Sequence, residues 1–443
     1  MTRRVVITGM GLVTPLGIEV EQVWQRLLAG ESGVAPITLF DAATFPSKFA
    51  AEVPDFDYLE AMPESLRTAH EEAGRNSQFM LAAALPAWRQ AKLPLPLPPD
   101  STHPANGPLP PAQRIGIYLG AGEGPLDFDN FIAPTVEAWN DDADDMDWQK
   151  WAQVALDRMH PKTELEQEPN MPSAHLAQLF KLRGPCVSCL TACAASTQAI
   201  GEATDLIRHN DADIIVAGGT HSMIHPLGVT GFNRLTALST RNNSCITASR
   251  PFDQDRDGFV LAEGAGVVIL EELETAQRRG AHILAEVIGY GSTADAFRVT
   301  DQHEDGRGGI AAVRQAISDA HLSIEDIDYI SAHGTGTAEN DSIETHVIKT
   351  VFGKRAYEIP ISSVKSMLGH LIAAAGVVEL ITCVLAIRDG QIPPTTNLST
   401  PDSDLDLDYV PNKPRQQVVN VAMSNSFGFG GQNNTIIIRK YSE

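Results

Sequence analysis

Short runs of apolar, largely β-branched residues alternate with helical patterns along most of this chain. Several of the runs are apolar throughout instead of alternating, as is typical of strands covered on both faces. The predicted strands lie at 5–8, 115–119, 214–217, 267–270, 327–331, 361–363, 418–423 and 435–438, and helical patterns lie at 20–28, 77–90, 194–208, 309–320, 342–350 and 373–388. This alternation predicts an α/β fold with mainly parallel sheets.

The length of the chain indicates more than one folding core. Because 443 residues exceed what a single ordinary core supports, we expect two domains or one duplicated architecture. A strand followed by a glycine turn opens a βα run at 5–11 and again at 327–336, which hints at duplication. With the join expected near 250–266, we predict an N-terminal half at 1–255 and a C-terminal half at 256–443.

Charge and hydropathy restrict the partners of the protein. The formal net charge of −23 argues against broad nucleic-acid binding through the phosphate backbone. No apolar stretch approaches the roughly 20 residues that span a membrane. The apolar run near Met1 is also too short for the core of a signal peptide. We therefore expect no nucleic acid partner and no membrane insertion.

The cysteines suggest a reducing compartment. Five are present, an odd and sparse set that is typical of reduced thiols in the cytoplasm. Cys186 and Cys189 form a CxxC pair inside an apolar strand, without a second pair to complete a four-ligand zinc site. The expectation is therefore a cytoplasmic protein with no bound metal.

Two segments interrupt the α/β pattern and are predicted to be insertions. Residues 93–111 are rich in proline and are typical of an extended surface loop. Residues 121–170 carry 13 acidic and 3 basic side chains, which favours a solvated acidic face. The aromatic residues Trp139, Trp148 and Trp151 suggest that part of this second insertion packs.

Cys193 is the strongest candidate nucleophile. It follows a strand-like run and precedes a helical pattern, with small residues on both sides. A thiol at the start of a helix faces unpaired N–H groups and the positive end of the helix dipole. Such surroundings predict a lowered thiol pKa and a reactive thiolate.

Two histidine loops further along the chain offer partners for this thiol. His333 ends an apolar strand in a Gly/Thr loop, and His370 ends a second loop before an alanine-rich helix. Together with Cys193 they form a set suited to nucleophilic acyl chemistry. Lys365 and Glu379 are predicted to form an ion pair that orients the histidines.

A glycine-rich loop at 425–433 completes the candidate site. Glycine allows backbone N–H groups to approach a ligand closely. We expect this loop to supply a donor to an oxyanion, although a plain glycine hairpin is the simpler reading of the loop alone.

The chain resembles the β-ketoacyl-ACP synthases of the elongating class II type, members of the thiolase superfamily. The resemblance rests on VVITGMG at 5–11, TAC at 191–193, PLGV at 226–229, ALSTR at 237–241, RPFD at 250–253, RDGFV at 256–260, AHGTGT at 332–337, KSMLGH at 365–370 and NSFGFGG at 425–431. These motifs stand in the family's order and span nearly the whole chain outside the two insertions. The resemblance implies a duplicated thiolase fold, layered α-β-α-β-α, with two mixed, mainly parallel sheets.

The resemblance also implies a role for each site residue. Cys193 would take an acyl group from an acyl carrier protein (ACP), and His333 and His370 would promote decarboxylation of malonyl-ACP and stabilise the enolate. Claisen attack on the acyl-Cys193 would then give 3-oxoacyl-ACP. The other implied roles are the oxyanion hole (backbone N–H groups of Cys193 and Phe429), the phosphopantetheine site (Thr335 and Thr337), the orienting ion pair (Lys365 and Glu379), and the acyl pocket (Phe427, Glu123 and Phe429 as its gate). Members of the family are homodimers without a metal or organic cofactor.

Glu123 is where the chain departs from the family's pattern. It stands where the family has an apolar residue lining the acyl pocket, and a carboxylate beside an alkyl chain is costly. An atypical or polar acyl chain, as in a secondary pathway, is therefore an alternative to fatty acid synthesis. Arg75, Arg234 and Arg241 are candidates for a basic patch that would dock the acidic carrier.

Other function classes are weaker. A non-elongating partner subunit usually lacks the nucleophile, which this chain has. Thiolase-type degradation calls for a cysteine near the C-terminus, and residues 425–433 contain none. A thioesterase-like hydrolase would need a water-activating carboxylate that the sequence does not indicate.

Overall fold

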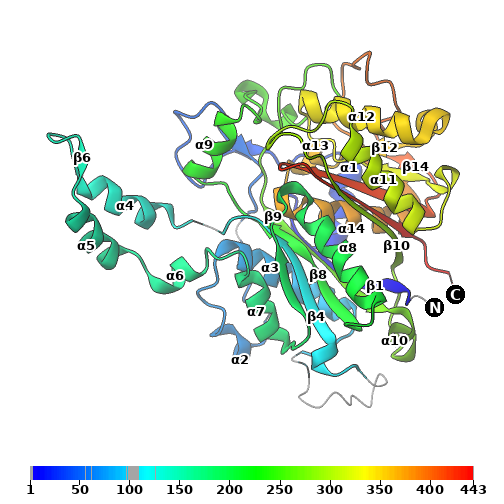
Figure 1. The fold of residues 1–443 in the computed structure, drawn as a ribbon, viewed down its shortest axis with the longest axis horizontal. Helices are drawn as coiled ribbons and strands as arrows, with labels where there is room; N and C mark the ends of the chain where they lie inside the picture. Colours follow the sequence, from blue (N-terminus) through cyan, green and yellow to red (C-terminus); the bar gives the residue numbers. More distant parts are fainter. Residues whose placement is uncertain are drawn as a thin grey trace.

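A single ten-stranded mixed sheet forms the centre of the computed structural model (Figure 1). The structure describes residues 3–54, 56–60, 62–95, 97, 109–124 and 126–442. The strand order is β12-β11-β15-β16-β10-β1-β9-β8-β4-β7. The strands are β1 (Val5–Val13), β4 (Ile115–Ala121), β7 (Cys186–Cys189), β8 (Ile214–His221), β9 (Gly264–Glu272), β10 (Ala285–Ala294), β11 (Tyr329–Ser331), β12 (Ile361–Ser362), β15 (Val421–Gly428) and β16 (Gln432–Arg439).

The sheet consists of two similar five-stranded halves that meet where β1 pairs with β10. In each half, two parallel pairs lead from the edge and two antiparallel pairs lead to the join. A Cβ on Gly9 of β1 would lie 2.1 Å from the carbonyl oxygen of Ala87, and one on Gly289 of β10 would lie 2.4 Å from that of Ala316. Both strands therefore press against a helix at a position that only glycine permits.

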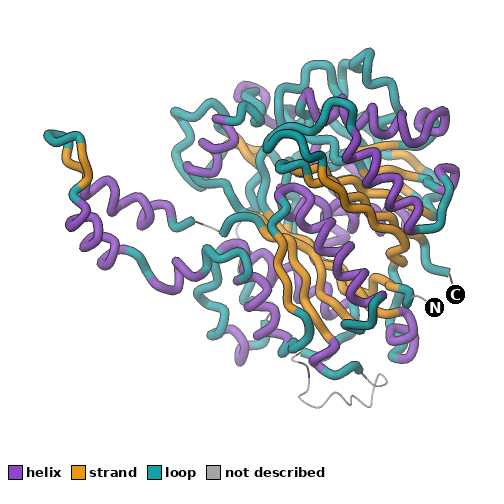
Figure 2. Tube along the Cα trace, in the orientation of Figure 1, coloured by secondary structure: helices purple, strands orange, loops and turns teal. Residues whose placement is uncertain are grey.

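Helices form three layers around the two halves of the sheet (Figure 2). The helices α8 (Ala195–Arg208) and α14 (Ala375–Asp389) contact each other and strands of both halves, so they form the inner layer. The outer layers contain α3 (Arg75–Gln90) and α7 (Met171–Phe180) on the first half, and α11 (Arg307–Asp319) and α12 (Ala338–Phe352) on the second. The inner layer is the least exposed, since 13 of the 15 residues of α14 are buried.

The expected duplicated α/β fold is confirmed, with differences in detail. The two expected sheets are continuous through β1 and β10, and only their outer strands pair in parallel. The predicted boundary between the two halves lies between residues 255 and 256. Strand β9 comes after this boundary in the sequence, yet it pairs with β1 and β8 of the first half. The counterpart of β1 is β10, a strand that the apolar patterns do not predict because Gly289 and Gly291 interrupt its alternation.

The acidic insertion forms an arm that projects from the body of the molecule (Figure 1). It contains α4 (Phe128–Ala138), β5 (Trp139–Asn140), β6 (Asp145–Met146), α5 (Trp148–Arg158) and α6 (Pro161–Leu165). Part of the arm packs, as expected, because α4 contacts α5 and Trp151 is half-buried, whereas Trp139 and Trp148 are 45% and 68% exposed. Most of the proline-rich insertion at 93–111 lies outside the described residues.

The remaining elements are short connections around this frame. They are α1 (Val20–Ala29), α2 (Glu64–Arg67), α9 (Pro226–Arg234), α10 (Leu273–Arg278) and α13 (Lys365–Leu368), the 3₁₀ turns η1 (Ala112–Arg114), η2 (Ala192–Ala194), η3 (Asn242–Thr247), η4 (Ile324–Asp326), η5 (Gly353–Tyr357) and η6 (Ile372–Ala374), and the small pairs β2 (Ala35–Pro36) with β3 (Phe49–Ala50) and β13 (Gln391–Ile392) with β14 (Arg415–Gln416). Within the described ranges, none of the helices has the length and apolarity to cross a membrane.

A buried histidine pair joins the base of the arm to the body. The Nδ1 atoms of His70 and His175 lie 2.8 Å apart, and His175 Nε2 lies 2.8 Å from a carboxylate oxygen of Glu166. That carboxylate also accepts hydrogen bonds from the backbone N–H of Gly74 and the hydroxyl of Ser77 at the start of α3. The two facing Nδ1 atoms share one proton. A second proton would place an N–H on both atoms, so the hydrogen bond between the rings would be lost.

This pair predicts a loss of stability on mild acidification. Burial and the neighbouring His175 lower the pKa of His70 from 6.5 to about 4. The unfolded chain therefore binds a proton at a higher pH than the folded chain. The free energy of unfolding should fall by up to about 3 kcal/mol as pH drops from about 6.5 to about 4. Urea unfolding at a series of pH values measures this slope, which His70→Gln should flatten and the exposed control His282→Gln should not. An unchanged slope in His70→Gln would contradict the assignment.

Candidate active site

Cys193 lies in the 3₁₀ turn η2 between strand β7 and helix α8. Its side chain belongs to the buried core and is 4% exposed. Strand β4 supports the turn so closely that a Cβ on Gly120 would lie 2.3 Å from the carbonyl carbon of Ala195. The small residues that flank Cys193 in the sequence are therefore required by packing as well as by access to the thiol.

Burial dominates the electrostatics of the thiol. Desolvation raises the pKa of Cys193 to about 11, although the charge of Lys365 and backbone hydrogen bonds from Phe429 and Cys193 itself act in the opposite direction. The prediction of a lowered pKa is therefore wrong for the free protein. The N–H groups of Phe429 and Cys193 nevertheless point at the sulfur, which is the arrangement predicted for an oxyanion hole.

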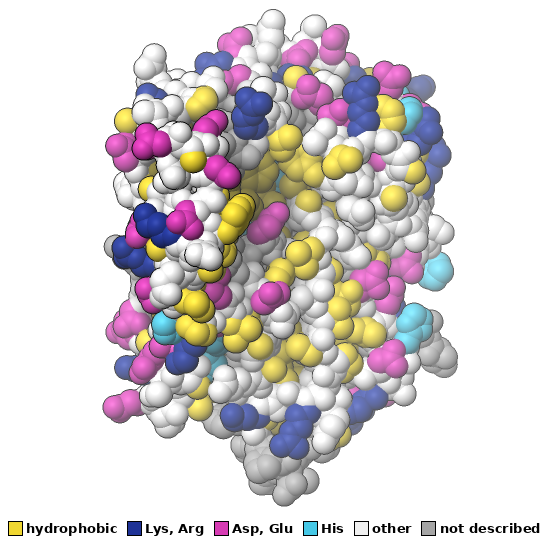
Figure 3. Space-filling view, turned by 60° about the vertical axis from the view of Figure 1, so that its left-hand side comes forward, with side chains coloured by type: hydrophobic (Ala, Val, Ile, Leu, Met, Phe, Trp, Pro, Cys, Tyr) yellow, Lys and Arg dark blue, Asp and Glu magenta, His cyan; other side chains and the backbone are white. Residues whose placement is uncertain are grey.

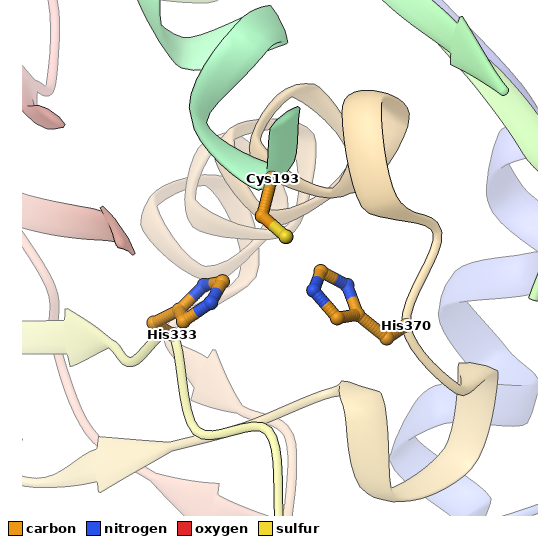
Figure 4. A group of neighbouring side chains, drawn as sticks. All are labelled: Cys193, His333 and His370. Atoms are coloured by element: carbon orange, nitrogen blue, oxygen red, sulfur yellow. The ribbon is translucent and has the colours of Figure 1, made fainter. Parts of the chain in front are cut away.

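The structure brings both predicted histidines to the thiol (Figure 4). His333 follows strand β11, and His370 lies between α13 and η6. The sulfur of Cys193 and one ring nitrogen of each histidine all lie within 4.8 Å of one another. The two imidazole rings are nearly perpendicular, with centroids 5.3 Å apart. Three segments that are distant in the sequence thus converge on one point.

Hydrogen bonds fix the same tautomer on both rings. The Nδ1 atom of His370 accepts from the backbone N–H of Ile372 at 3.2 Å, and Nδ1 of His333 lies 3.4 Å from the ammonium of Lys365. Each neutral ring therefore carries its proton on Nε2. Burial lowers the pKa of both histidines well below 6.5, and Lys365 lowers them further, so both rings are neutral. The result is two uncharged N–H donors on side chains that are almost completely buried.

Lys365 and Glu379 form the predicted ion pair, and the pair is buried. Their side chains are each 2% exposed. The ammonium of Lys365 also donates to the backbone carbonyl of His333 at 2.6 Å. Lys365 thus fixes both the ring and the backbone of His333, while Glu379 compensates its charge.

Two carboxylates that the sequence patterns do not single out accept hydrogen bonds from the backbone of the His333 loop. Glu344 accepts hydrogen bonds from the backbone N–H groups of His333 and Gly334, both at 2.8 Å, and burial raises its pKa to about 7. Asp341 accepts from the N–H of Gly336 at 3.2 Å. Both residues lie on α12 at a spacing of i, i+3, which places them on one helix face. In the sequence they are indistinguishable from surface acids at the start of a helix.

A cleft of about 370 Å³ opens above the three side chains. Its lining includes four of the five predicted substrate contacts, Thr335, Thr337, Phe427 and Phe429. The hydroxyls of Thr335 and Thr337 lie 3.0 Å apart. The other polar residues that line it are Thr236, Arg256, Asp257, Thr300, Asp301, Gln302, Glu339 and Asn340.

Neither Glu123 nor the three candidate arginines are among the residues that line the described cleft. Glu123 is exposed just beyond strand β4 and is not among the residues that line the described cleft. Its contact with an acyl chain remains a prediction. Arg75 forms an ion pair with the buried Glu263, and Arg241 lies 3.6 Å from Asp257 at the cleft. Arg234 is exposed.

The trio of Cys193, His333 and His370 is close enough to hold a metal ion, but its chemistry does not fit one. A metal-ligating histidine offers a lone pair and donates its other N–H to an acceptor. Here both Nδ1 atoms face donors, which leaves the protonated Nε2 toward the cleft. The nearby ammonium of Lys365 adds repulsion to a cation.

Strand β15 ends at Gly428, directly before Phe429, whose backbone N–H is a predicted oxyanion donor. A substitution at Gly428 tests whether the end of this strand positions that donor. A Cβ at this residue would lie 3.2 Å from the backbone nitrogen of Ala194 and 3.3 Å from that of Cys193. We expect Gly428→Ala to displace the adjacent Phe429 N–H and to slow acylation of Cys193 by about 10–100-fold. Intact-protein mass spectrometry over time measures the rate. Gly231→Ala is the matched control, since a Cβ there meets nothing within 4 Å. A wild-type rate in Gly428→Ala would contradict the prediction.

Known proteins resemble this chain over both halves. The models "Beta-ketoacyl synthase, N-terminal domain" and "Beta-ketoacyl synthase, C-terminal domain" match residues 2–276 and 284–399. A 3-oxoacyl-[acyl-carrier-protein] synthase 2 of Coxiella burnetii is 42% identical over 99% of both chains, and one of Synechocystis is 40% identical over 99% of this chain and 98% of its own. Among solved structures, AntDE:AntF, a type II PKS acyl-carrier protein in complex with its ketosynthase bound to the hexaketide, matches with a TM-score of 0.84, 32% identity and full coverage of both chains.

Proposed function

Because this chain belongs to the β-ketoacyl synthase family, we propose that its cleft condenses an acyl group on Cys193 with malonyl-ACP. The protein is an acyltransferase of the condensing class, and its product is a 3-oxoacyl-ACP lengthened by two carbons. The pathway is fatty acid biosynthesis or a related polyketide-like route. The observation that carries the residue roles is the convergence of two Nε2–H and two backbone N–H donors around one thiol.

The first step transfers the acyl group to the enzyme. The sulfur of Cys193 attacks the thioester carbonyl of acyl-ACP, and the N–H groups of Cys193 and Phe429 hold the oxyanion of the tetrahedral intermediate. The thiol of the carrier's phosphopantetheine leaves and gains the proton that Cys193 loses. Because burial keeps the free thiol neutral, this proton must leave the sulfur during the attack and end on the departing phosphopantetheine sulfur.

The second step makes the new carbon–carbon bond. The carboxylate of malonyl-ACP leaves as CO₂, and its bonding electrons form an enolate whose oxygen accepts from Nε2–H of His333 and His370. The enolate carbon attacks the acyl-Cys193 carbonyl, and when that carbonyl re-forms the sulfur leaves as a thiolate, which then takes up one proton from solvent. Neutral donors suit this step because they stabilise the enolate without the cost of a buried net charge.

One assay tests the proposal. The wild-type protein, acyl-ACP and malonyl-ACP should give CO₂ and a 3-oxoacyl-ACP two carbons longer, identified by mass spectrometry. Acylation of Cys193 without any condensation product would favour the alternative of a non-elongating partner subunit. The complete set of Cys193, His333 and His370 supports the condensing enzyme over that alternative.

Thr335 and Thr337 line the cleft and are proposed to bind the phosphopantetheine arm of the carrier. The carrier protein itself is the proposed macromolecular partner, and the reaction as written needs no metal or organic cofactor. A cytoplasmic location remains a prediction from the cysteines, which are free throughout the described residues.

We also propose that the protein is a homodimer. Strand β7 forms one edge of the sheet, and its side chains are exposed or half-buried. Leu190, directly after it, is 55% exposed. Apolar side chains gather across the face seen when the arm side of the molecule is turned forward (Figure 3). An uncovered apolar edge strand favours association, and a two-fold axis would place two such edges together.

A charge in this edge should weaken the dimer. We expect Leu190→Glu to raise the dimer dissociation constant by about 30-fold or more, because the carboxylate would be desolvated in the interface. Sedimentation velocity over a concentration series measures the effect. Val418→Glu is the control, since Val418 is 72% exposed and outside the proposed interface. Equal dissociation constants for the two variants would count against β7 as the interface.

A further inference from the structure

His221, the last residue of strand β8, is a fully buried histidine without a role in the proposed mechanism. Its side chain is 0% exposed, and neither ring nitrogen has a hydrogen-bond partner among the described residues. Burial lowers the pKa of His221 to about 3, so the ring is neutral and offers one donor and one acceptor. Unpaired buried polar groups are costly and few in native proteins, which indicates that this ring has a partner outside the chain.

The strand register places His221 on the face of the sheet that supports the nucleophile. Gly219 and His221 share one face of β8, because side chains alternate along a strand. A Cβ on Gly219 would lie 2.7 Å from the Cβ of Ser196, three residues after Cys193. The imidazole is one strand repeat, about 7 Å, further along the same face. There it occupies the space above Gly122, where a Cβ would lie 1.9 Å from its Nδ1.

An apolar cluster packs against the thiol on this side. We name it the thiol-side cluster, and it consists of Ala50, Cys193, Ile224, Val229, Leu238, Phe259, Leu261 and Ile372. Ile224 follows His221 by three residues, and Ile372 follows His370 by two. His221 is also close enough to His370 to lower its pKa. A polar ring thus borders an apolar region that contains the nucleophile.

Neighbouring polar groups do not satisfy this ring. Nδ1 of His225 already accepts the backbone N–H of Gly228 at 3.2 Å and caps helix α9. Glu123 influences the pKa of His225, yet its own side chain is exposed. Both ring nitrogens of His221 therefore keep free hydrogen-bonding capacity among the described residues.

We propose that His221 hydrogen-bonds to an oxo or hydroxyl group on the acyl chain that Cys193 carries. His221 is then a specificity-determining residue, and the enzyme selects oxygen-bearing acyl chains over saturated ones of the same length. The ring can donate its N–H to an oxo or hydroxyl oxygen, or its unprotonated nitrogen can accept the O–H of a hydroxyl. This inference rests on the proposed function, since it requires an acyl group on Cys193.

The test compares acylation rates for matched chains. The probes are octanoyl-ACP and three oxo-octanoyl-ACPs with the oxo group near the thioester, in mid-chain or near the far end. In the wild-type protein, at least one oxo chain should acylate Cys193 about tenfold faster than octanoyl. His221→Leu should remove that preference and speed acylation by octanoyl, whereas His221→Gln, which keeps a donor and an acceptor, should retain part of it. The exposed His282→Leu is the matched control.

Each outcome separates this inference from the proposed function. If none of the four thioesters acylates Cys193, the proposed function fails. If octanoyl and all three oxo chains acylate the wild-type protein at equal rates, the function stands and the inference is wrong, with water as the partner of the ring. An unchanged oxo preference in His221→Leu would also overturn the assignment to His221. Should His221→Leu not fold, the wild-type rates and His221→Gln decide the question.

Discussion

Replacing Cys193 by alanine should abolish acyl-enzyme formation and slow condensation by at least about 10⁴-fold. The sulfur is the proposed carrier of the acyl group, so its loss removes a covalent step that the hydrogen-bond donors cannot replace. Alanine fits the turn, because its side chain differs from that of cysteine only by the loss of the sulfur atom. Intact-protein mass spectrometry measures acylation, and detection of 3-oxoacyl-ACP measures condensation.

The same variant separates the two halves of the reaction. In the proposed mechanism, decarboxylation of malonyl-ACP depends on the Nε2–H donors of His333 and His370, which Cys193→Ala leaves in place. CO₂ release should therefore persist while condensation is lost. His370→Ala is the complementary control and should impair CO₂ release. Undiminished condensation by Cys193→Ala would refute the proposed nucleophile.

Replacing Lys365 by methionine should lower both stability and activity. The change leaves Glu379 buried without its partner, which typically costs about 3–5 kcal/mol in the free energy of unfolding. It also removes the donor to Nδ1 of His333, so the ring no longer has a fixed tautomer. We expect at least about a 100-fold loss of condensation. Urea unfolding and the product assay measure the two effects.

A double variant distinguishes a positioning role from a structural one. Lys365→Met with Glu379→Leu removes both charges, so most of the lost stability should return while the activity should not. Lys349→Met provides the surface control, because its pair with Asp406 is solvated and should contribute less than about 1 kcal/mol. Recovery of condensation in the double variant would show that Lys365 acts only through folding.

The fold was predictable where local patterns are strong. Apolar runs and helical periods mark most strands and helices, including β1 and α14. Strand β10 escapes such patterns because Gly289 and Gly291 serve a contact with α11 that lies far away in the sequence. The arm shows the same limit, since residue type alone does not indicate that Trp151 is half-buried while Trp139 and Trp148 are exposed.

The site was predictable to the level of residue types. The motifs around Cys193, His333 and His370 identify the groups that converge, because nucleophilic acyl chemistry restricts which residues can do it. The electrostatics were less predictable. The helix start suggests a lowered thiol pKa, whereas burial raises it to about 11. The sequence did not identify Glu344 and His221. Burial and the hydrogen bonds they make or lack single them out, and these depend on residues distant in the sequence.

By itself, the sequence predicted the α/β class, a duplicated architecture and the side chains that meet at the site, because apolar periodicity and motif chemistry are local properties. The tertiary structure decided how these groups behave. It buried the thiol, set the tautomers of His333 and His370 through Lys365 and Ile372, and enclosed His221 without a partner. Desolvation and hydrogen bonding depend on every atom packed around a group, and those atoms come from segments up to hundreds of residues apart.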